Sequence, residues 1–95
     1  MAYEQLVFRV HAIQRMFQRR ITDEDVRDVL RTGEVIESYP DDTPYPSRLV
    51  LGFRGPRPIH VVAADDLQAG QTIVISAYEP DPARWDEAFR RRKQS

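Results

Sequence analysis

The chain has 95 residues, 41% of them hydrophobic and 31% charged, which suits one small domain spanning residues 1–95. Cysteine is absent, which excludes disulfides and thiolate zinc sites and fits the reducing cytoplasm, where we expect the protein to reside. No apolar run approaches the ~20 residues that cross a bilayer, so no membrane partner is expected. The formal net charge is -1, so any nucleic-acid binding must come from a local basic patch.

The first predicted element is a helix within residues 11–20, "HAIQRMFQRR". On a wheel of about 100° per residue, Ile13, Met16, Phe17 and Arg20 fall on one side. The segment is therefore predicted to be amphipathic, with Met16 and Phe17 packed on the rest of the fold. The opposite side of the helix is polar and carries His11, Arg15, Gln18 and Arg19.

A second helix is predicted to begin after Thr22, a residue that favours the N-cap position. Asp25, three residues on, completes a variant of the capping box, and acids in the first turn favour the positive end of the helix dipole. The buried stripe of this helix is expected to consist of Val26, Val29 and Leu30. Gly33 should end it.

The second half of the chain predicts strands, because β-branched and apolar residues alternate there between proline- and glycine-containing turns. Four strands are expected, at Glu34–Tyr39, 49–54, 59–64 and Gln71–Tyr78. Their short connections favour antiparallel neighbours.

The chain after Tyr78 is predicted to form a short helix. Asp81 is a residue type that favours the N-cap position and Pro82 one that favours the first helical position. Trp85 and Phe89 are four residues apart, which is a helical spacing. Trp85 should pack back on the sheet, while the basic run at 90–93 should be a frayed, solvated end. The predicted fold is therefore α+β, with two N-terminal helices on a four-stranded antiparallel sheet and a short C-terminal helix.

His11 is the first candidate for chemistry, since it stands where the first helix begins. The helix N-terminus and Arg15 both disfavour a positive charge there, so a neutral His11 would suit a general base. Arg15 and Arg19 follow at i+4 and i+8, and guanidinium groups bind phosphate. Together, His11, Arg15 and Arg19 predict a site at which an RNA phosphate is attacked by the RNA's own 2′-hydroxyl. The alternative is structural: His11 bonds the backbone and the arginines pair with acids.

His60 lies in an apolar strand, "PIHVVAA". It is either a hydrogen-bonded structural residue or a second acid–base group beside His11. Tyr78 ends the last strand, where it points at a site or packs against Trp85. No spacing typical of a metal site connects the two histidines with the acids, and no phosphate-cradling glycine loop is present, so we expect neither metal nor cofactor.

Two further residues are candidates for contacts with substrate. Tyr39 flanks the proline-rich loop, where an aromatic ring could stack on a base. Arg48 begins the second strand and could add a phosphate contact. Either residue could instead serve packing alone.

Three stretches of the chain resemble one known family. They are "HAIQRMFQRRITDEDVRDVLRTGEVIESYP", "PSRLVLGFRGPRPIHVV" and "TIVISAYEPDPARWDEAFRRRK". In combination they resemble the bacterial and archaeal domain of unknown function 4258, over about residues 11–93. That family is similar to toxins of the RelE and ParE superfamily, with helices packed on a curved antiparallel sheet. Its members are often encoded beside a zinc-finger protein resembling the MqsA antitoxin.

Two classes of function follow as expectations. By the resemblance, the chain looks like the toxin of a type II toxin–antitoxin system. It would be an endoribonuclease that needs no metal, with His11, Arg15, Arg19, His60 and Tyr78 as catalytic residues, and its partner would be a zinc-finger antitoxin. The alternative is a non-catalytic module that uses the same fold to bind a partner protein.

Overall fold

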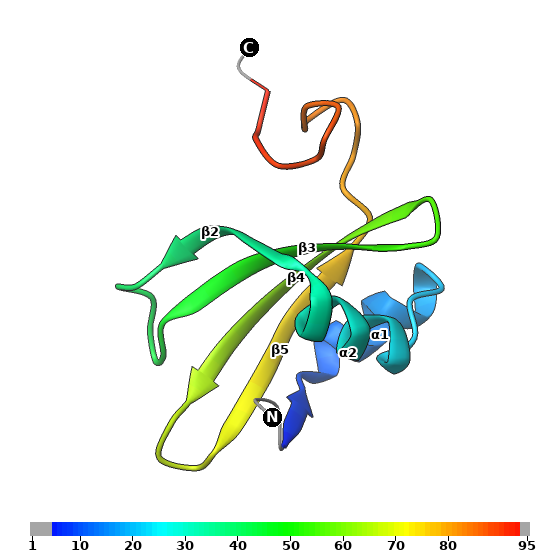
Figure 1. Ribbon diagram of the computed structural model, residues 1–95. Coiled ribbons are helices and arrows are strands. Elements are labelled where there is room, and N and C mark those ends of the chain that lie inside the picture. Colours follow the sequence, from blue (N-terminus) through cyan, green and yellow to red (C-terminus); the bar gives the residue numbers. More distant parts are fainter. Residues whose placement is uncertain (1–4, 94–95) are drawn as a thin grey trace.

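The computed structural model describes residues 5–93, which contain two helices and five strands (Figure 1). The elements in order are β1 Leu6–Phe8, α1 Val10–Gln18, α2 Asp23–Thr32, β2 Glu34–Tyr39, β3 Ser47–Arg54, β4 Arg57–Asp66 and β5 Gln71–Tyr78. All five strands form one sheet, in the order β1-β5-β4-β3-β2. Both helices pack on one face of that sheet, α1 against β5 and α2 against β3 and β4.

The expected four-stranded antiparallel sheet is wrong, because a fifth strand makes the sheet mixed. β2 to β5 pair antiparallel, but β1 adds to the edge of β5 in parallel, with Leu6 opposite Thr72 and Phe8 opposite Val74. Three residues are too few to show the period-2 pattern that identifies a strand. Parallel pairing also needs a long connection, which α1, α2 and three strands provide here.

The expected C-terminal helix is also wrong. Residues 79–93, which we call the C-terminal segment, form only turns and one isolated bridge between Trp85 and Arg92. Its backbone closes on itself through Asp86 N–H donating to Arg91 at 2.9 Å and Lys93 N–H donating to Arg84 at 2.8 Å. These bonds replace the i to i−4 ladder that a helix requires, and the segment folds into a loop that places Trp85 on the sheet.

Helix α1 buries a narrower face than the apolar pattern predicted. Ala12 and Met16, one turn apart, are 0% and 5% exposed and join the core against β5. Ile13 and Phe17 are 52% and 86% exposed, so the prediction that Phe17 packs on the sheet is wrong. The helical wheel grouped the large apolar side chains Ile13, Met16 and Phe17 on the buried side. Contact with β5 instead turns the small Ala12 inward.

Helix α2 matches its sequence signals closely. The Thr22 hydroxyl accepts from Asp25 N–H and the Asp25 carboxylate accepts from Thr22 N–H, each at 3.0 Å, so the capping box is complete. The helix packs against β3 at Gly52, where a Cβ would stand 2.9 Å from Val29 Cγ2. Only glycine allows this approach of helix to sheet.

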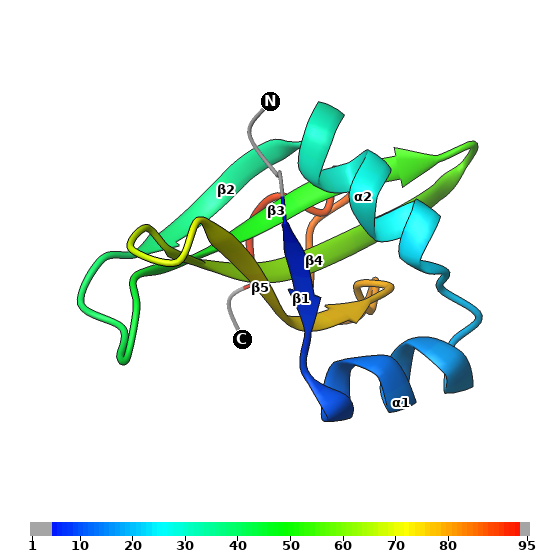
Figure 2. The same cartoon turned by 90° about the horizontal axis from the view of Figure 1, so that it is seen from below.

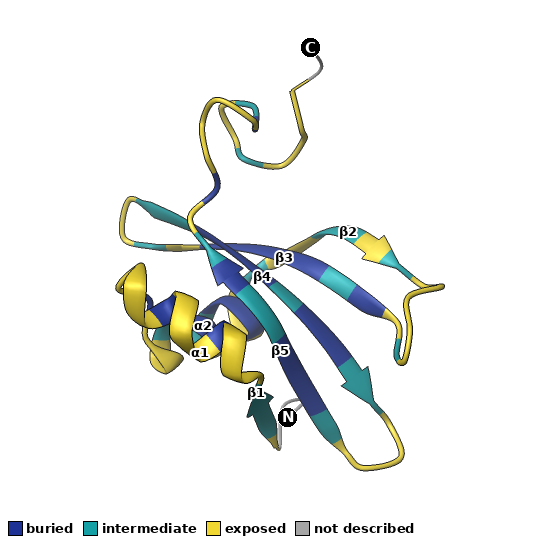
Figure 3. Cartoon of the chain, turned by 180° about the vertical axis from the view of Figure 1, so that it is seen from behind, coloured by how far each residue is buried: buried dark blue, intermediate teal, exposed yellow. Residues whose placement is uncertain are grey.

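The two faces of the sheet have different covers. Ile59 and Val61 of β4 join the core beneath the helices, so the intervening His60 points to the opposite face. That second face is covered by the C-terminal segment. In Figure 2, α2 lies in front of the sheet and the orange and red C-terminal segment lies behind it. Figure 3 shows that the middles of β3, β4 and β5 are largely buried.

Candidate functional site

His60 and Tyr78 form the centre of the sheet face that the C-terminal segment covers. They are direct partners across β4 and β5, so their side chains leave the sheet on the same side. Their rings meet edge to face with centroids 5.3 Å apart, and the Trp85 ring meets His60 in the same manner at 4.4 Å. Trp85 therefore anchors the C-terminal segment on the sheet. It also shields His60 from solvent, and His60 is 0% exposed.

The hydrogen bonds of His60 define its tautomer. Nε2 lies 2.8 Å from the backbone oxygen of Phe89, and because a carbonyl can only accept, Nε2 must carry the proton. Nδ1 then accepts from the Tyr78 hydroxyl, 3.4 Å away. Burial lowers the pKa of His60 and raises the pKa of Tyr78, so both groups are neutral near pH 7. The pair forms a connected chain from Tyr78 through the imidazole to Phe89.

A carboxylate and a guanidinium border this pair. Arg92 lies over the Trp85 ring, 4.8 Å from its centroid, and pairs with Glu37 at 3.4 Å. Burial alone would raise the pKa of Glu37, but hydrogen bonds from Tyr39 and Arg92 leave it lower than usual. Glu37 is therefore a carboxylate at neutral pH, and its charge faces the His60 side of the sheet.

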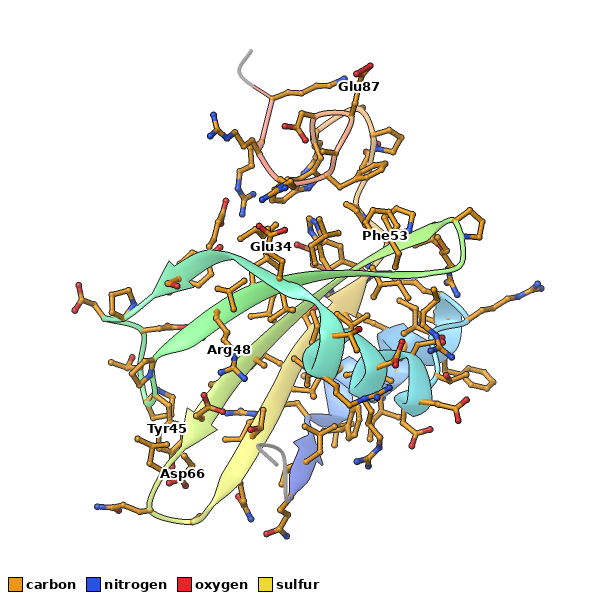
Figure 4. The ribbon with its side chains drawn as sticks, in the orientation of Figure 1. Glu34, Tyr45, Arg48, Phe53, Asp66 and Glu87 are labelled. Atoms are coloured by element: carbon orange, nitrogen blue, oxygen red, sulfur yellow. The ribbon has the colours of Figure 1, made fainter. Side chains whose placement is uncertain are left out.

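An irregularity in β2 gives the C-terminal segment a second ionic contact. The register between β2 and β3 shifts between Val35 and Glu37, so Glu34 and Glu37 reach the same face although they are three residues apart. Glu34 pairs with Arg90, and Figure 4 shows Glu34 beneath the C-terminal segment. Two ion pairs and the buried Trp85 therefore bind the segment 79–93 to the sheet.

An open pocket of about 530 Å³ lies beside this cluster. Its lining residues come from the end of α1, the end of β5 and the C-terminal segment: Arg19, Tyr78, Glu79, Asp81, Arg84, Trp85 and Arg92. We call it the arginine pocket. Glu79, an acid of this lining, is paired with Arg57. The pocket arginines Arg19 and Arg84 have no carboxylate within 4.0 Å among residues 5–93. Asp81, the other acid of the lining, accepts from Ala83 N–H at 2.9 Å and forms no ion pair among the described residues. The pocket therefore offers two arginines without a carboxylate partner, beside one unpaired aspartate.

Arg57 fixes the end of α1 against this pocket. Its guanidinium donates to the backbone oxygens of Arg20 at 2.8 Å and Arg19 at 2.6 Å, which have no partner within the helix. Arg19 in turn donates to the backbone oxygen of Ala77, 3.3 Å away. The side chain of Arg19, one of the three arginines of the pocket, is thus anchored to β5 next to Tyr78.

The structure brings together three of the residues predicted from sequence. Arg19 and Tyr78 line the arginine pocket, and His60 lies directly behind Tyr78. Tyr39 borders the same cluster, where its hydroxyl donates to Glu37. Tyr39 is half-buried and also lines a second pocket, together with Ser38, Pro40 and Val62.

Two residues predicted for catalysis lie elsewhere. His11 and Arg15 are exposed on α1, the helix that packs on the sheet face opposite to His60. His11 stands eight residues before Arg19, a rise of about 12 Å along the helix. His11 and His60 are therefore not neighbours, and the structure does not form the pair of imidazoles that the sequence left open.

Arg48 is likewise separate from the pocket. It pairs with Asp65, whose carboxylate also accepts from Thr72 at 2.8 Å. In Figure 4, Arg48 lies away from the C-terminal segment, on the side where Tyr45 donates to Asp66 at 2.9 Å. Arg48 therefore connects β3 to β4 instead of contacting a substrate at the pocket.

Sequence reasoning missed Arg57, Arg84, Arg92 and Glu37. Arg92 belonged to a basic run that was expected to be a solvated tail, yet it lies on Trp85. The sequence signal for the position of Arg92 was Trp85, because burial of a tryptophan also brings the residues near it in sequence close to the sheet. Nothing in the sequence marked Arg57, whose partners are more than 20 residues away.

Among residues 5–93, no group of three histidine, aspartate or glutamate side chains is arranged to hold a metal ion. Over the same range, no helix is both long and apolar enough to cross a membrane.

Comparison with known proteins gives a family. The model of the domain of unknown function DUF4258 matches residues 8–79, a range that contains Arg19, His60 and Tyr78 and ends before Trp85. Searches among curated proteins and among solved structures found no match. The family match covers more than half of the chain, which therefore belongs to the DUF4258 family.

Proposed function

We propose that this chain is an RNA-cleaving toxin of a toxin–antitoxin pair and that the arginine pocket is its active site. The observation that carries the proposal is that Arg19, Arg84 and Arg92 line one pocket with Tyr78, whose hydroxyl lies 3.4 Å from Nδ1 of the neutral His60 imidazole. The resemblance of the family to the RelE and ParE superfamily supports the same class of function. By that resemblance the partner is an antitoxin of the MqsA-like zinc-finger type.

The pocket favours a phosphodiester for reasons of charge. Guanidinium groups remain charged at all physiological pH values and bind phosphate oxygens in bidentate geometry. Arg19 and Arg84 have no carboxylate partner among residues 5–93, so their charge is available to a ligand. A local site of this kind can bind RNA although the net charge of the chain is -1, because phosphate contacts depend on the nearby field.

The chemistry we propose uses the Tyr78–His60 chain as the base. The ribose 2′-oxygen bonds to the adjacent phosphorus and the bond from phosphorus to the 5′-oxygen breaks, which leaves a 2′,3′-cyclic phosphate. The 2′-hydroxyl proton passes to the Tyr78 oxygen while the proton of Tyr78 passes to Nδ1 of His60. The departing 5′-oxygen takes a proton from water, and the arginines stabilise the charge on the phosphoryl oxygens.

The surroundings of His60 allow it to hold that proton briefly. Burial and the charge of Arg92 lower the pKa of His60 and oppose an imidazolium, whereas the Phe89 carbonyl and the Glu37 carboxylate favour one. The neutral form at rest keeps Nδ1 free to accept. The imidazolium then returns its proton through Tyr78 to solvent, which restores the starting tautomer.

A second candidate is a protein-binding module without catalysis. The observation in its favour is that both nitrogens of His60 already have partners inside the protein, as in a purely structural histidine. The two candidates differ in whether purified protein cuts RNA.

The test combines induced expression with cleavage of end-labelled RNA by purified protein. We expect growth arrest, and products ending in a 2′,3′-cyclic phosphate. Tyr78→Phe should lower the cleavage rate by about a hundred- to ten-thousand-fold, and Arg19→Ala or Arg84→Ala by about a hundred- to a thousand-fold. Arg91→Ala is the matched control, since Arg91 is exposed in the same segment but does not line the pocket.

The same assay includes His11→Ala and Arg15→Ala, checked for folding by circular dichroism. If these variants lose activity while Tyr78→Phe keeps it, the active site lies on the basic face of α1 and the arginine pocket is wrong. If the parent protein neither arrests growth nor cuts RNA, the binding module replaces the enzyme.

A further inference from the structure

Helix α1 carries apolar side chains that the fold leaves exposed. Val10, Ile13 and Phe17 are 67%, 52% and 86% exposed, and their i, i+3, i+7 spacing places them in one stripe. Ala12 and Met16 anchor the helix from another side, so the stripe contributes little to the core. Among residues 5–93, the other large exposed apolar residues are Val35 in β2, Phe53 in β3 and Leu67 in the turn between β4 and β5, and they do not form such a row.

We propose that this α1 stripe, Val10, Ile13 and Phe17, is a docking surface for an acidic amphipathic helix of a partner protein. Rows of apolar side chains at this spacing are the anchors through which helices bind one another. A contiguous exposed apolar row on a small soluble domain is typical of an interaction site. The proposal does not depend on RNA cleavage, and none of the three apolar residues of the stripe lines the arginine pocket.

The charge around the stripe selects the partner. Residues 9–20 contain no acid. Arg9 and Arg20 stand at the two ends of α1, next to the stripe, whereas His11, Arg15 and Arg19 lie on the opposite side of the helix. None of these four arginines has a carboxylate within 4.0 Å among residues 5–93. Within α2, Asp23 pairs with Arg27, and Asp25 and Asp28 pair with Arg54. Glu24 lies 4.0 Å from Arg54 and its side chain is 85% exposed. A partner helix with glutamate or aspartate beside its apolar row therefore complements this surface.

A second copy of the chain is a poorer occupant. A two-fold contact through α1 would place the arginines of one helix against those of the other. Like charges brought together in this way oppose association. An anionic lipid surface would satisfy the charge, but the stripe is only about two turns long, which gives little apolar area to insert.

The test uses two designed peptides of about 18 residues, or five helical turns. Both carry leucine at i, i+3, i+4 and i+7, with glutamate on the flanks of one and lysine on the flanks of the other. Fluorescence anisotropy should show binding of the glutamate peptide only, weaker at higher salt. Phe17→Ser and Ile13→Ser should each weaken it by about tenfold or more.

Leu67→Ser is the matched control, because Leu67 is 88% exposed, like Phe17, but lies in the turn between β4 and β5. This variant should bind as the parent does. The proposal fails if the glutamate peptide does not bind, if the lysine peptide binds equally well, or if Leu67→Ser weakens binding as much as Phe17→Ser.

Two further measurements test the other occupants. Sedimentation that shows a dimer lost in Phe17→Ser would assign the stripe to a second copy and overturn the proposal. Phe17-dependent binding to phosphatidylserine vesicles, without binding to the glutamate peptide, would assign it to a membrane surface and overturn it equally.

Discussion

Nε2 of His60 donates a hydrogen bond to the backbone oxygen of Phe89 across 2.8 Å, although 29 residues separate them. This bond connects the central strand β4 to the C-terminal segment and fixes the tautomer that presents Nδ1 to Tyr78. The packing of the segment and the protonation state of the histidine are therefore coupled. Several measurable properties depend on that coupling.

The first prediction is that acid destabilises the protein through His60. Burial lowers the pKa of His60 in the folded state, so below the unfolded value of about 6.5 the unfolded chain binds a proton that the folded chain does not. The free energy of unfolding should be fully present above about pH 6.5 and should fall as pH drops below it, with a slope of at most ~1.4 kcal/mol per pH unit. Urea titrations between about pH 5 and pH 8 measure this slope.

The control variants for the first prediction are His60→Gln and His11→Gln. The slope should be lost when the buried histidine is replaced and kept when the exposed one is replaced. An unchanged slope in the His60→Gln protein would show that another group causes the pH dependence.

The second prediction concerns Trp85, which is 4% exposed and contacts His60. Trp85→Ala should lower the free energy of unfolding by about 3–5 kcal/mol, as other large aromatic truncations do. Truncation after Glu79 should lower it by several kcal/mol as well, and it should speed amide exchange along β2. A truncated protein with the melting temperature of the parent would contradict the packing of this segment.

The third prediction concerns the contact between Gly52 and Val29. A Cβ at position 52 would lie 2.9 Å from one Val29 methyl carbon and 3.1 Å from the Val29 Cα. Gly52→Ala should therefore cost about 1–3 kcal/mol through overpacking. The double variant with Val29→Ala should cost less than the sum of the single variants, because the smaller side chain relieves the overlap. Strict additivity in denaturant titrations would argue against direct contact.

The fourth prediction concerns Arg20, which ends α1 in the left-handed region with a φ of 57°. Ile21 N–H donates to Met16 at 2.9 Å and Arg20 N–H donates to Phe17 at 3.3 Å, the pattern of a Schellman motif that usually places glycine at this position. Arg20→Gly should therefore stabilise the protein by roughly 0.5–1 kcal/mol.

Arg15→Gly is the matched control for the fourth prediction, since the same substitution lies inside α1. It should destabilise by about 1 kcal/mol. If thermal melts show both variants shifted in the same direction, the left-handed backbone at Arg20 is not under strain.

The sequence by itself determined the local structure of α2 and the positions of strands β2 to β5. Thr22 and Asp25 dictate a capping box through hydrogen bonds that span only three residues. Gly33 ends the helix as predicted. Pro40 after β2, and the β-branched residues of β5 with Pro80 soon after it, predict the observed bounds of these two strands. Each of these features depends on neighbours within a few residues, so a linear pattern contains the information.

The tertiary structure alone decided the remaining features. Strand β1 exists because β5 offers it an edge, since three residues carry no pattern of their own. The C-terminal segment is not a helix because burial of Trp85 against His60 and the ion pairs of Arg90 and Arg92 stabilise a loop instead. Packing therefore overrides local propensity there.

The candidate site divides in the same way. Residue types identified Arg19, His60 and Tyr78 as candidates, because charge and acid–base chemistry are properties of the side chain. Their meeting with Arg84 and Arg92, and the separation of His11 and Arg15 from them, arise from contacts between elements far apart in sequence. Which face of α1 packs on β5 depends on the fit of Ala12 and Met16, and that fit exists only once the sheet has formed.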